Sequence, residues 1–374
     1  MLIIVLVAAV FIGYIFLALD PLQEEMSELL VGVDVAYDNM EEIKALVDEI
    51  SNYTNTLVVG STGITHNLTK LNEICKYVYD RDMYFMTYMH PDPEQLDEQR
   101  QWVEEARTRW GQRFLGLYTF DEPGGRQLDD AQYKVFYETP TNYTDATDKY
   151  VSELNNILLH IRESPINAGS LPLFTSDYAF YWFDYKGGYD VVFAEFGWNY
   201  SRQLNVALCR GAATAQNKEW GVMITWTYNH PPYLESGPKL YDDLVLAYNN
   251  GAKYILVFDT NEDYTHGVLK EEHLEALKQF WNYTENNPRK NEASSERVAY
   301  VLPKDFAYGF RGPNDKIWGF WEANQLSYDI SVNLGKALED YETKLDIIYE
   351  DGLKSIDSTE YSKLIFWNGT TYEP

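Results

Sequence analysis

The chain has 374 residues, which is enough for one large domain and a small addition. It contains 58 Asp and Glu residues against 30 Lys and Arg residues, so its formal net charge is −28. This charge repels nucleic acid and anionic lipid headgroups and excludes both as partners, whereas neutral and cationic ligands are allowed. Aromatic residues are abundant, with 31 Tyr, 17 Phe and 10 Trp. Many of these rings must lie at surfaces or in a cleft, where they could stack on sugar rings.

Residues 1–19 are uncharged and apolar, and the apolar run stops at Asp20-Pro21. A helix of this length barely crosses a hydrocarbon core about 30 Å thick. The segment lacks a basic start and a clean cleavage site, and it has no polar face that would suit a core helix. We therefore predict a signal peptide or a membrane anchor, with the anchor favoured. Contact with a membrane is expected through this segment only.

Six Asn-x-Ser/Thr sequons follow the apolar segment, which is compatible with an exported glycoprotein. Their asparagines are Asn52, Asn67, Asn142, Asn199, Asn282 and Asn368. We expect an extracellular or cell-surface location.

Eight short apolar runs lie in the first three-quarters of the chain, and nearly all end in a carboxylate, an aromatic or a hydroxyl. They cover 30–36, 56–60, 84–89, 114–120, 171–176, 191–196, 221–228 and 253–258. Segments with helical period separate most of them; in the first, Ile43, Val47 and Ile50 share one face. Strand followed by helix, eight times, predicts a (β/α)₈ TIM barrel over 28–285. The carboxyl ends of its strands would carry the chemistry.

Two further segments depart from the regular repeat. The long excursion 124–143 after the fourth strand is a candidate lid or subsite wall. The aromatic stretch 178–188 between the fifth and sixth strands could line a cleft or cap the barrel. Cys75 and Cys209 fall on the second and sixth helices, on opposite sides of the ring, so we predict free buried thiols.

A polar linker, 286–297, separates the barrel from a small α/β unit over 298–374. Its expected strands are 298–302, 345–349 and 364–367, with a helix over 326–341. Three strands bury too little surface to predict independent folding, so we expect the unit to dock on the barrel. Residues 318–322, Trp-Gly-Phe-Trp-Glu, could instead fold over the barrel mouth.

Asp121-Glu122 at the end of the fourth strand is the sharpest chemical signal. Cleavage of a glycosidic bond needs a proton donor beside a carboxylate that supports an oxocarbenium-like transition state. The competing interpretation is structural, because a carboxylate followed by Pro123 could simply cap and start a helix.

The motif Asp121-Glu122-Pro123 resembles the Asn-Glu-Pro that ends the fourth strand of clan A glycoside hydrolases. That resemblance implies that Glu122 is the acid/base. The clan places its nucleophilic Glu on the seventh strand, where this chain reads Thr-Trp-Thr-Tyr-Asn-His over 225–230, without a carboxylate. The nearest substitute is Glu195 at the end of the sixth strand. A carboxyl separation of about 5 Å or of about 7–9 Å would give opposite stereochemical outcomes, and the sequence leaves both open.

A second mechanism also fits the motif. The adjacent Asp-Glu pair is similar to that of substrate-assisted hexosaminidases, which implies that Asp121 orients an acetamido group and Glu122 donates the proton. No second enzyme carboxylate is then needed, and Tyr228 could assist. A glycan on Asn199 would crowd this mouth.

Other strand ends supply candidate substrate contacts, each of which has a structural alternative such as a core hydrogen bond or core packing. These candidates are Asp34, Tyr88, His90, Asp177, Trp198, Trp226, Tyr228 and Asp259. Six scattered histidines without metal spacing argue against a metal site. No Gly-rich phosphate loop and no Gly-x-Ser-x-Gly motif occurs, so we predict no cofactor.

A barrel followed by a small flavodoxin-like or amidotransferase-like α/β domain resembles the family 42 β-galactosidases. The resemblance implies a role of the small domain in assembly, as in a homo-oligomer. The small domain lacks a Cys nucleophile, which excludes amidotransferase chemistry. We therefore expect an exported glycoside hydrolase-like protein that acts on an extracellular or cell-surface glycan. The alternative is a non-catalytic glycan-binding or structural protein on the same scaffold.

Overall fold

The computed structural model describes residues 27–89, 96–129, 132–162, 171–289, 296–356 and 360–373. The expected anchor at 1–19 and the candidate His90 lie outside these ranges. Across the described residues, no helix is both long and apolar enough to cross a membrane.

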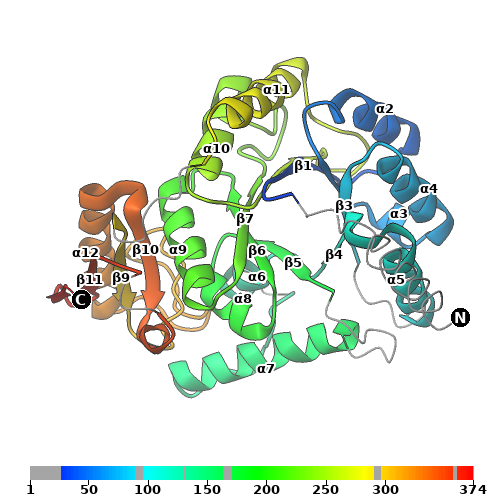
Figure 1. The fold of residues 1–374 in the computed structure, drawn as a ribbon. Helices are drawn as coiled ribbons and strands as arrows, with labels where there is room; N and C mark the ends of the chain where they lie inside the picture. Colours follow the sequence, from blue (N-terminus) through cyan, green and yellow to red (C-terminus); the bar gives the residue numbers. More distant parts are fainter. Residues whose placement is uncertain are drawn as a thin grey trace, which may run out of the picture.

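Eight parallel strands close into a barrel in chain order, with β1 paired to β8 (Figure 1). The strands are β1 Leu30–Val35, β2 Thr56–Val59, β3 Tyr84–Tyr88, β4 Phe114–Tyr118, β5 Leu173–Asp177, β6 Val191–Phe196, β7 Glu219–Ile224 and β8 Tyr254–Asp259. The predicted (β/α)₈ barrel is confirmed. The seventh strand ends earlier than predicted, because the backbone N–H groups of Thr227 and Tyr228 both donate to the carbonyl of Tyr233 in a turn.

Helices surround the barrel as a ring (Figure 1). They are α2 Met40–Ile50, α3 Thr62–Thr65, α4 Leu68–Tyr79, α5 Leu96–Trp110, α6 Pro123–Asp129, α7 Tyr143–Arg162, α8 Tyr181–Gly187, α9 Arg202–Ala215, α10 Gly237–Asn249 and α11 Glu271–Asn286. Local capping explains several starts: the side chains of Asn39, Asn67 and Ser201 accept backbone N–H groups at the first turns of α2, α4 and α9.

The barrel interior is filled by aromatic rings. Phe174 on β5 lies 5.8 Å from Phe193 on β6 and 5.3 Å from Tyr254 on β8, measured between ring centroids. Side chains alternate along a strand, so residues two positions further towards the carboxyl end also point inward. These positions are polar on β5 and β6, where Ser176 and Glu195 follow Phe174 and Phe193. The barrel therefore has an apolar floor below a polar mouth.

The C-terminal unit is a four-stranded sheet with one long helix. It contains β9 Val298–Leu302, α12 Gln325–Tyr341, β10 Leu345–Tyr349, β11 Lys363–Phe366 and β12 Thr371–Tyr372, in the strand order β10-β9-β11-β12. The strands β10, β9 and β11 run parallel, as the predicted α/β unit requires, and the antiparallel β12 was not predicted.

The C-terminal unit docks against α9 of the barrel (Figure 1). Helix α9 is buried on almost every face, as expected for a helix between two sheets. Gly211 permits the close approach, because a Cβ atom there would lie 2.3 Å from the carbonyl oxygen of Ile347 on β10. The expected docking on the barrel is thus observed.

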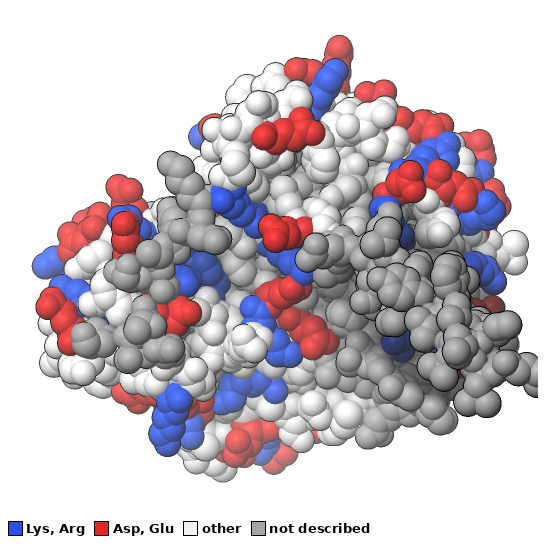
Figure 2. All heavy atoms as spheres, viewed as in Figure 1, with Lys and Arg blue, Asp and Glu red and all other residues white. Residues whose placement is uncertain are grey.

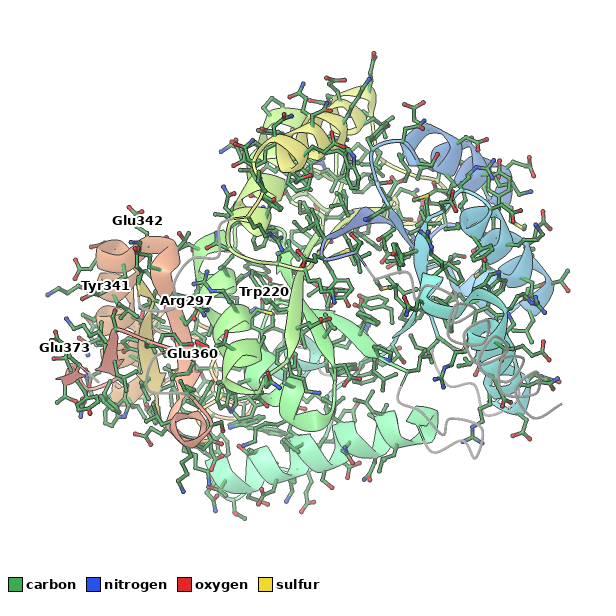
Figure 3. The ribbon with its side chains drawn as sticks, viewed as in Figure 1. Trp220, Arg297, Tyr341, Glu342, Glu360 and Glu373 are labelled. Atoms are coloured by element: carbon green, nitrogen blue, oxygen red, sulfur yellow. The ribbon has the colours of Figure 1, made fainter. Side chains whose placement is uncertain are left out.

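Arg210 of α9 and the fully buried Asp346 of β10 form an ion pair across this interface, with 2.7 Å between Nε and Oδ1. Arg297 adds a second contact to Asp346 at 3.1 Å, and it also lies 3.6 Å from Glu360. Figure 3 shows Arg297 and Glu360 on the side of the C-terminal unit that faces the barrel. Because Asp346 is paired on both oxygens, its burial is compensated.

The two aromatic segments whose roles the sequence left undecided, 178–188 and 318–322, contribute side chains to the core of this interface. Trp318 is fully buried and packs on Phe183 of α8, with 4.7 Å between ring centroids. Trp182 of the same helix packs on Tyr349 at 5.1 Å. The stretch 178–188 therefore forms mostly interface core rather than cleft lining, and Trp318 lies within that core rather than over the barrel mouth.

The surface carries charges of both signs. Figure 2 shows acidic side chains interspersed with basic ones over the visible face. Cys75 and Cys209 are both buried free thiols, as predicted.

Candidate active site

The carboxyl end of β4 turns sharply at the expected motif. Phe120 and Glu122 have positive φ angles of 48° and 53°, which are uncommon for residues other than glycine. The turn is held by a hydrogen bond from the Glu122 backbone N–H to the carbonyl of Ser176 at 3.0 Å. Helix α6 then starts at Pro123, which leaves the Asp121 and Glu122 side chains half-buried.

Glu195 reaches the same place from β6. It follows Val191 and Phe193 at a spacing of two and is only 4% exposed. Its carboxyl and that of Glu122 influence each other electrostatically. The two acidic residues expected to carry the chemistry therefore lie close together at the mouth.

The pKa of Glu122 is raised to about 8, mainly by burial and then by the nearby charges of Asp121 and Asp177. The pKa of Glu195 is also raised, by burial first and then by Glu122 and Asp121. Two close carboxylates cannot both ionise without strong repulsion, so the pair retains at least one proton at neutral pH.

Hydroxyl groups connect Asp121 to the pair. The Oγ atom of Ser176 lies 3.0 Å from Asp121 Oδ1 and 2.7 Å from Glu195 Oε1. The phenol of Tyr118 hydrogen-bonds Asp121 and lies 2.9 Å from Ser176 Oγ. Tyr118 and Ser176 were not among the predicted site residues. Strand alternation could have found them, because both point into the barrel.

Asp177 plays a structural role at the start of α6. It is fully buried, and its carboxylate accepts the backbone N–H groups of Gly124, Gly125, Tyr178 and Ala179. Burial raises its pKa to about 7, against the opposing effect of these donors. Asp177 thus has the helix-capping role that the sequence suggested as an alternative for Asp121-Glu122. The prediction that Asp177 contacts substrate is not supported, because the side chain next to the inward-facing Ser176 points away from the cavity.

Asp259 on β8 is held in the same way. Its Oδ1 atom accepts the backbone N–H groups of Val268 and Leu269, the latter at 2.9 Å. Its neighbour Phe258 occupies the inward-facing position. Asp259 therefore holds the loop after β8 in place, whereas the sequence had suggested that it contacts substrate.

Asp34 on β1 differs from these two acids. It is 2% exposed, and its Oδ1 atom has no hydrogen-bond partner among the described residues. Gly60 provides its space, because a Cβ atom there would lie 2.2 Å from that oxygen. Burial raises the pKa of Asp34, and the charge of Asp121 raises it further. Asp34 therefore belongs to the mouth.

The aromatic candidates occupy several environments. Tyr88 on β3 is half-buried beside Tyr118, with 5.6 Å between ring centroids. Trp226 packs on Phe258 at 5.8 Å and donates its indole N–H to Thr260 O at 2.9 Å, so much of it is structural. Trp198 and Tyr228 are 37% and 38% exposed and remain accessible for stacking.

Within the described residues, no group of three or more His, Cys, Asp or Glu side chains is arranged to hold a metal ion. The chemistry of the mouth is therefore argued from carboxyls, hydroxyls and aromatic rings.

The fold is similar to that of several sugar-processing enzymes. α-L-Fucosidase isoenzyme 2 from Paenibacillus thiaminolyticus has 11% identity and a TM-score of 0.52 over 89% of this chain and 59% of that chain. β-1,4-D-Mannanase from Cryptopygus antarcticus has 13% identity and a TM-score of 0.42 over 67% and 90% of the two chains. Endo-β-1,4-mannanase from Thermotoga petrophila has 9% identity and a TM-score of 0.44 over 73% and 82%.

No family model and no curated protein matches the sequence. At such low identities the likeness concerns the fold alone, which is a closed barrel of eight parallel strands. The arrangement of family 42 in particular is not established by it.

Proposed function

We propose that this protein hydrolyses O-glycosidic bonds, with Glu122 as general acid and Glu195 as its partner carboxylate. The observation that carries the proposal is the closeness of the half-buried Glu122 and the buried Glu195 at the carboxyl end of the barrel, where each influences the ionisation of the other. Both have raised pKa values, as expected where carboxyl groups exchange protons with substrate.

The mutual influence of Glu122 and Glu195 favours a double displacement. Inverting enzymes keep their carboxyls about 6.5–9.5 Å apart to admit a water, whereas retaining enzymes hold them about 5–5.5 Å apart. Each of the two carboxyls raises or lowers the pKa of the other, which favours the closer arrangement. Glu122 would protonate the glycosidic oxygen as the C–O bond breaks, and Glu195 would bond to the anomeric carbon. Water, deprotonated by Glu122, would then release the sugar.

The assignment of roles rests on access. Glu122 is half-buried whereas Glu195 is only 4% exposed, so Glu122 is the carboxyl that can reach a glycosidic oxygen. Ser176 can donate to Glu195, which partly offsets the burial that raises the pKa of that carboxyl. In the substrate-assisted alternative, Asp121 would orient an acetamido group and Glu195 would not be needed as a nucleophile.

A glycan outside the cell remains the proposed substrate. The apolar segment 1–19 supports export, and all six sequon asparagines are exposed in the folded chain. Membrane attachment through 1–19 and assembly through the C-terminal unit belong to the same proposal.

The decisive experiment compares hydrolysis of a panel of aryl glycosides, including N-acetylhexosaminides, by the wild type, Glu122→Gln and Glu195→Gln. Loss of a general acid costs about 10²–10⁴-fold, and the loss should be greatest for poor leaving groups. The exposed Glu262→Gln on the loop after β8 is the matched control.

Loss of activity in both site variants with an intact control supports the two-carboxylate mechanism. Loss in Glu122→Gln alone, on an acetamido sugar only, would favour substrate assistance. Activity that survives Glu122→Gln contradicts the assignment, and sugar binding without any hydrolysis favours the glycan-binding alternative.

A further inference from the structure

The barrel mouth carries a concentration of acidic groups. The charge of Asp121 raises the pKa values of Asp34, Glu122 and Glu195 there. Arg126 offsets this only weakly, as a minor influence on Glu122 beside burial and two acids. A ligand that enters the mouth therefore meets an excess of carboxyl groups.

One of these carboxyls, that of Asp34, is placed to bind a polar group of a ligand. Asp34 is almost fully buried, faces the mouth and leaves its Oδ1 atom without a partner among the described residues. A buried polar atom without a hydrogen bond is costly, and folded proteins rarely retain one unless it has a task. Gly60 keeps the space around this oxygen free of a side chain.

Three tyrosines lie near the same carboxyls. Tyr88, Tyr118 and Tyr264 are all within electrostatic influence of Asp34 and Asp121. Tyr88 and Tyr118 contact each other, whereas Tyr264 is 54% exposed on the loop after β8. We call Asp34, Asp121 and these three tyrosines the mouth cage. Carboxylates combined with aromatic rings are the groups that recognise an ammonium ion.

We propose that the mouth cage binds the protonated amine of an amino sugar that carries a free amino group. The inference rests on the proposed hydrolase function, because the cage adjoins Glu122 and Glu195 and would select the sugar presented to them. A neutral hydroxyl could not stabilise these carboxyls in their charged form as an ammonium can. A metal ion is less suited, since the described residues provide no set of three metal ligands.

Binding of an ammonium ion should be coupled to the release of protons, which can be measured. Burial and nearby carboxyl charges raise the pKa values of Asp34 in the cage and of its neighbour Glu122, so both groups tend to hold protons. A bound cation stabilises the charged carboxyls, so protons are released as the amine binds. A neutral sugar that binds in the same place releases none.

The test compares glucosamine, N-acetylglucosamine and glucose by titration calorimetry with the purified protein at about pH 6, where a sugar amine is protonated. Titration in buffers of different ionisation enthalpy counts the protons released. We expect glucosamine to bind about ten- to a hundredfold more tightly than either neutral sugar, with proton release. Equal binding of the three sugars, or no binding of glucosamine, overturns the inference.

Variants connect this preference to the cage. Asp34→Asn keeps the shape and removes the charge, and it should abolish most of the preference for glucosamine. Asp263→Asn removes the same charge from an exposed position next to Tyr264 and should retain the preference. If Asp34→Asn does not fold, Tyr264→Leu at an exposed position provides the second test. A preference that survives either cage substitution contradicts the proposal.

Hydrolysis assays distinguish a failure of this inference from a failure of the proposed function. Glu122-dependent cleavage of a neutral aryl glycoside but not of the aryl glucosaminide would leave the hydrolase standing and overturn the amine site. Selective glucosamine binding without cleavage of any aryl glycoside would do the reverse.

Discussion

The Oγ atom of Ser176 lies 2.7 Å from Oε1 of Glu195, and 3.0 Å from Oδ1 of Asp121. A serine hydroxyl has one proton and can donate to only one of these carboxyls at a time. Tyr118 supplies its own proton to Asp121. Ser176 is therefore available to Glu195, where its donation favours the charged form.

Replacement of Ser176 by alanine should raise the pKa of Glu195, because the hydrogen bond that lowers this pKa is removed. If Glu195 must be ionised for attack, the rising limb of the pH dependence of kcat/KM moves to higher pH. Activity at about pH 7 should fall by roughly tenfold. Tyr118→Phe is the comparison, since Tyr118 bonds to Asp121 and Ser176 rather than to Glu195 directly. An unchanged limb in Ser176→Ala would contradict the role given to this serine.

The pH dependence of kcat/KM distinguishes the two mechanisms, because it reports the ionisation of the free enzyme. The two-carboxylate mechanism needs one charged and one protonated carboxyl. The pKa of Glu122 is raised to about 8 and that of Glu195 is raised as well, so the singly protonated pair becomes more populated as the pH rises towards 8. We expect kcat/KM for a neutral aryl glycoside to rise over this range.

Substrate assistance predicts the opposite slope, since it needs only a protonated Glu122. Activity would then fall as the pH rises through about 8. Thermal unfolding measured at each pH, without substrate, checks that neither slope arises from loss of folded protein.

The sequence predicts the barrel well because its signals are local. Each strand is a short apolar run, and each run ends at a polar residue or a turn. Glu122 and Glu195 could be named as a pair because the carboxyl ends of all barrel strands meet at one mouth. Their mutual placement could not be predicted, since it depends on the positive φ angle of Glu122 and on the stagger of the strands.

The roles of the other acids depend on which way each side chain points, not on how close it is to the end of its strand. Asp177 and Asp259 end their strands as Asp34 nearly does, yet the carboxylates of the first two accept hydrogen bonds from backbone N–H groups. Their inward-facing neighbours are Ser176 and Phe258, which strict alternation would have indicated. The aromatic stretch containing Trp182 was ambiguous for another reason, because its partner Tyr349 lies in a different domain.

Asp177→Asn should destabilise the fold without contacting substrate. The amide retains one acceptor oxygen but directs an NH₂ group at a backbone N–H, which leaves a buried donor unpaired at a cost of about 1–3 kcal/mol. Burial raises the pKa of Asp177 to about 7, so the stability that depends on its neutral form is fully present at low pH. That stability is lost as the pH rises through about 7.

The free-energy difference between wild type and Asp177→Asn should therefore be larger at about pH 5 than at about pH 8. Urea unfolding at both pH values measures it, with the exposed Asp148→Asn as control. A difference that grows with pH would mean that the four N–H donors outweigh burial and stabilise the charged carboxylate.

The interface between the barrel and the C-terminal unit can be tested at two helical glycines. A Cβ atom at Gly211 of α9 would lie 2.3 Å from the carbonyl oxygen of Ile347, so Gly211→Ala must push β10 away from the barrel. A Cβ atom at Gly335 of α12 meets nothing within 4 Å.

Gly211→Ala should lower the free energy of unfolding by about 1–3 kcal/mol, as overpacking of a buried contact does. Gly335→Ala should raise it by up to about 1 kcal/mol, because alanine is the better helix former and finds open space. Chemical denaturation measures both variants. Hydrogen exchange should show faster exchange in α9 and β10 for Gly211→Ala alone, since that contact carries Arg210 and Asp346 as well. Equal effects of the two substitutions would contradict the close packing of α9 against β10 at Gly211.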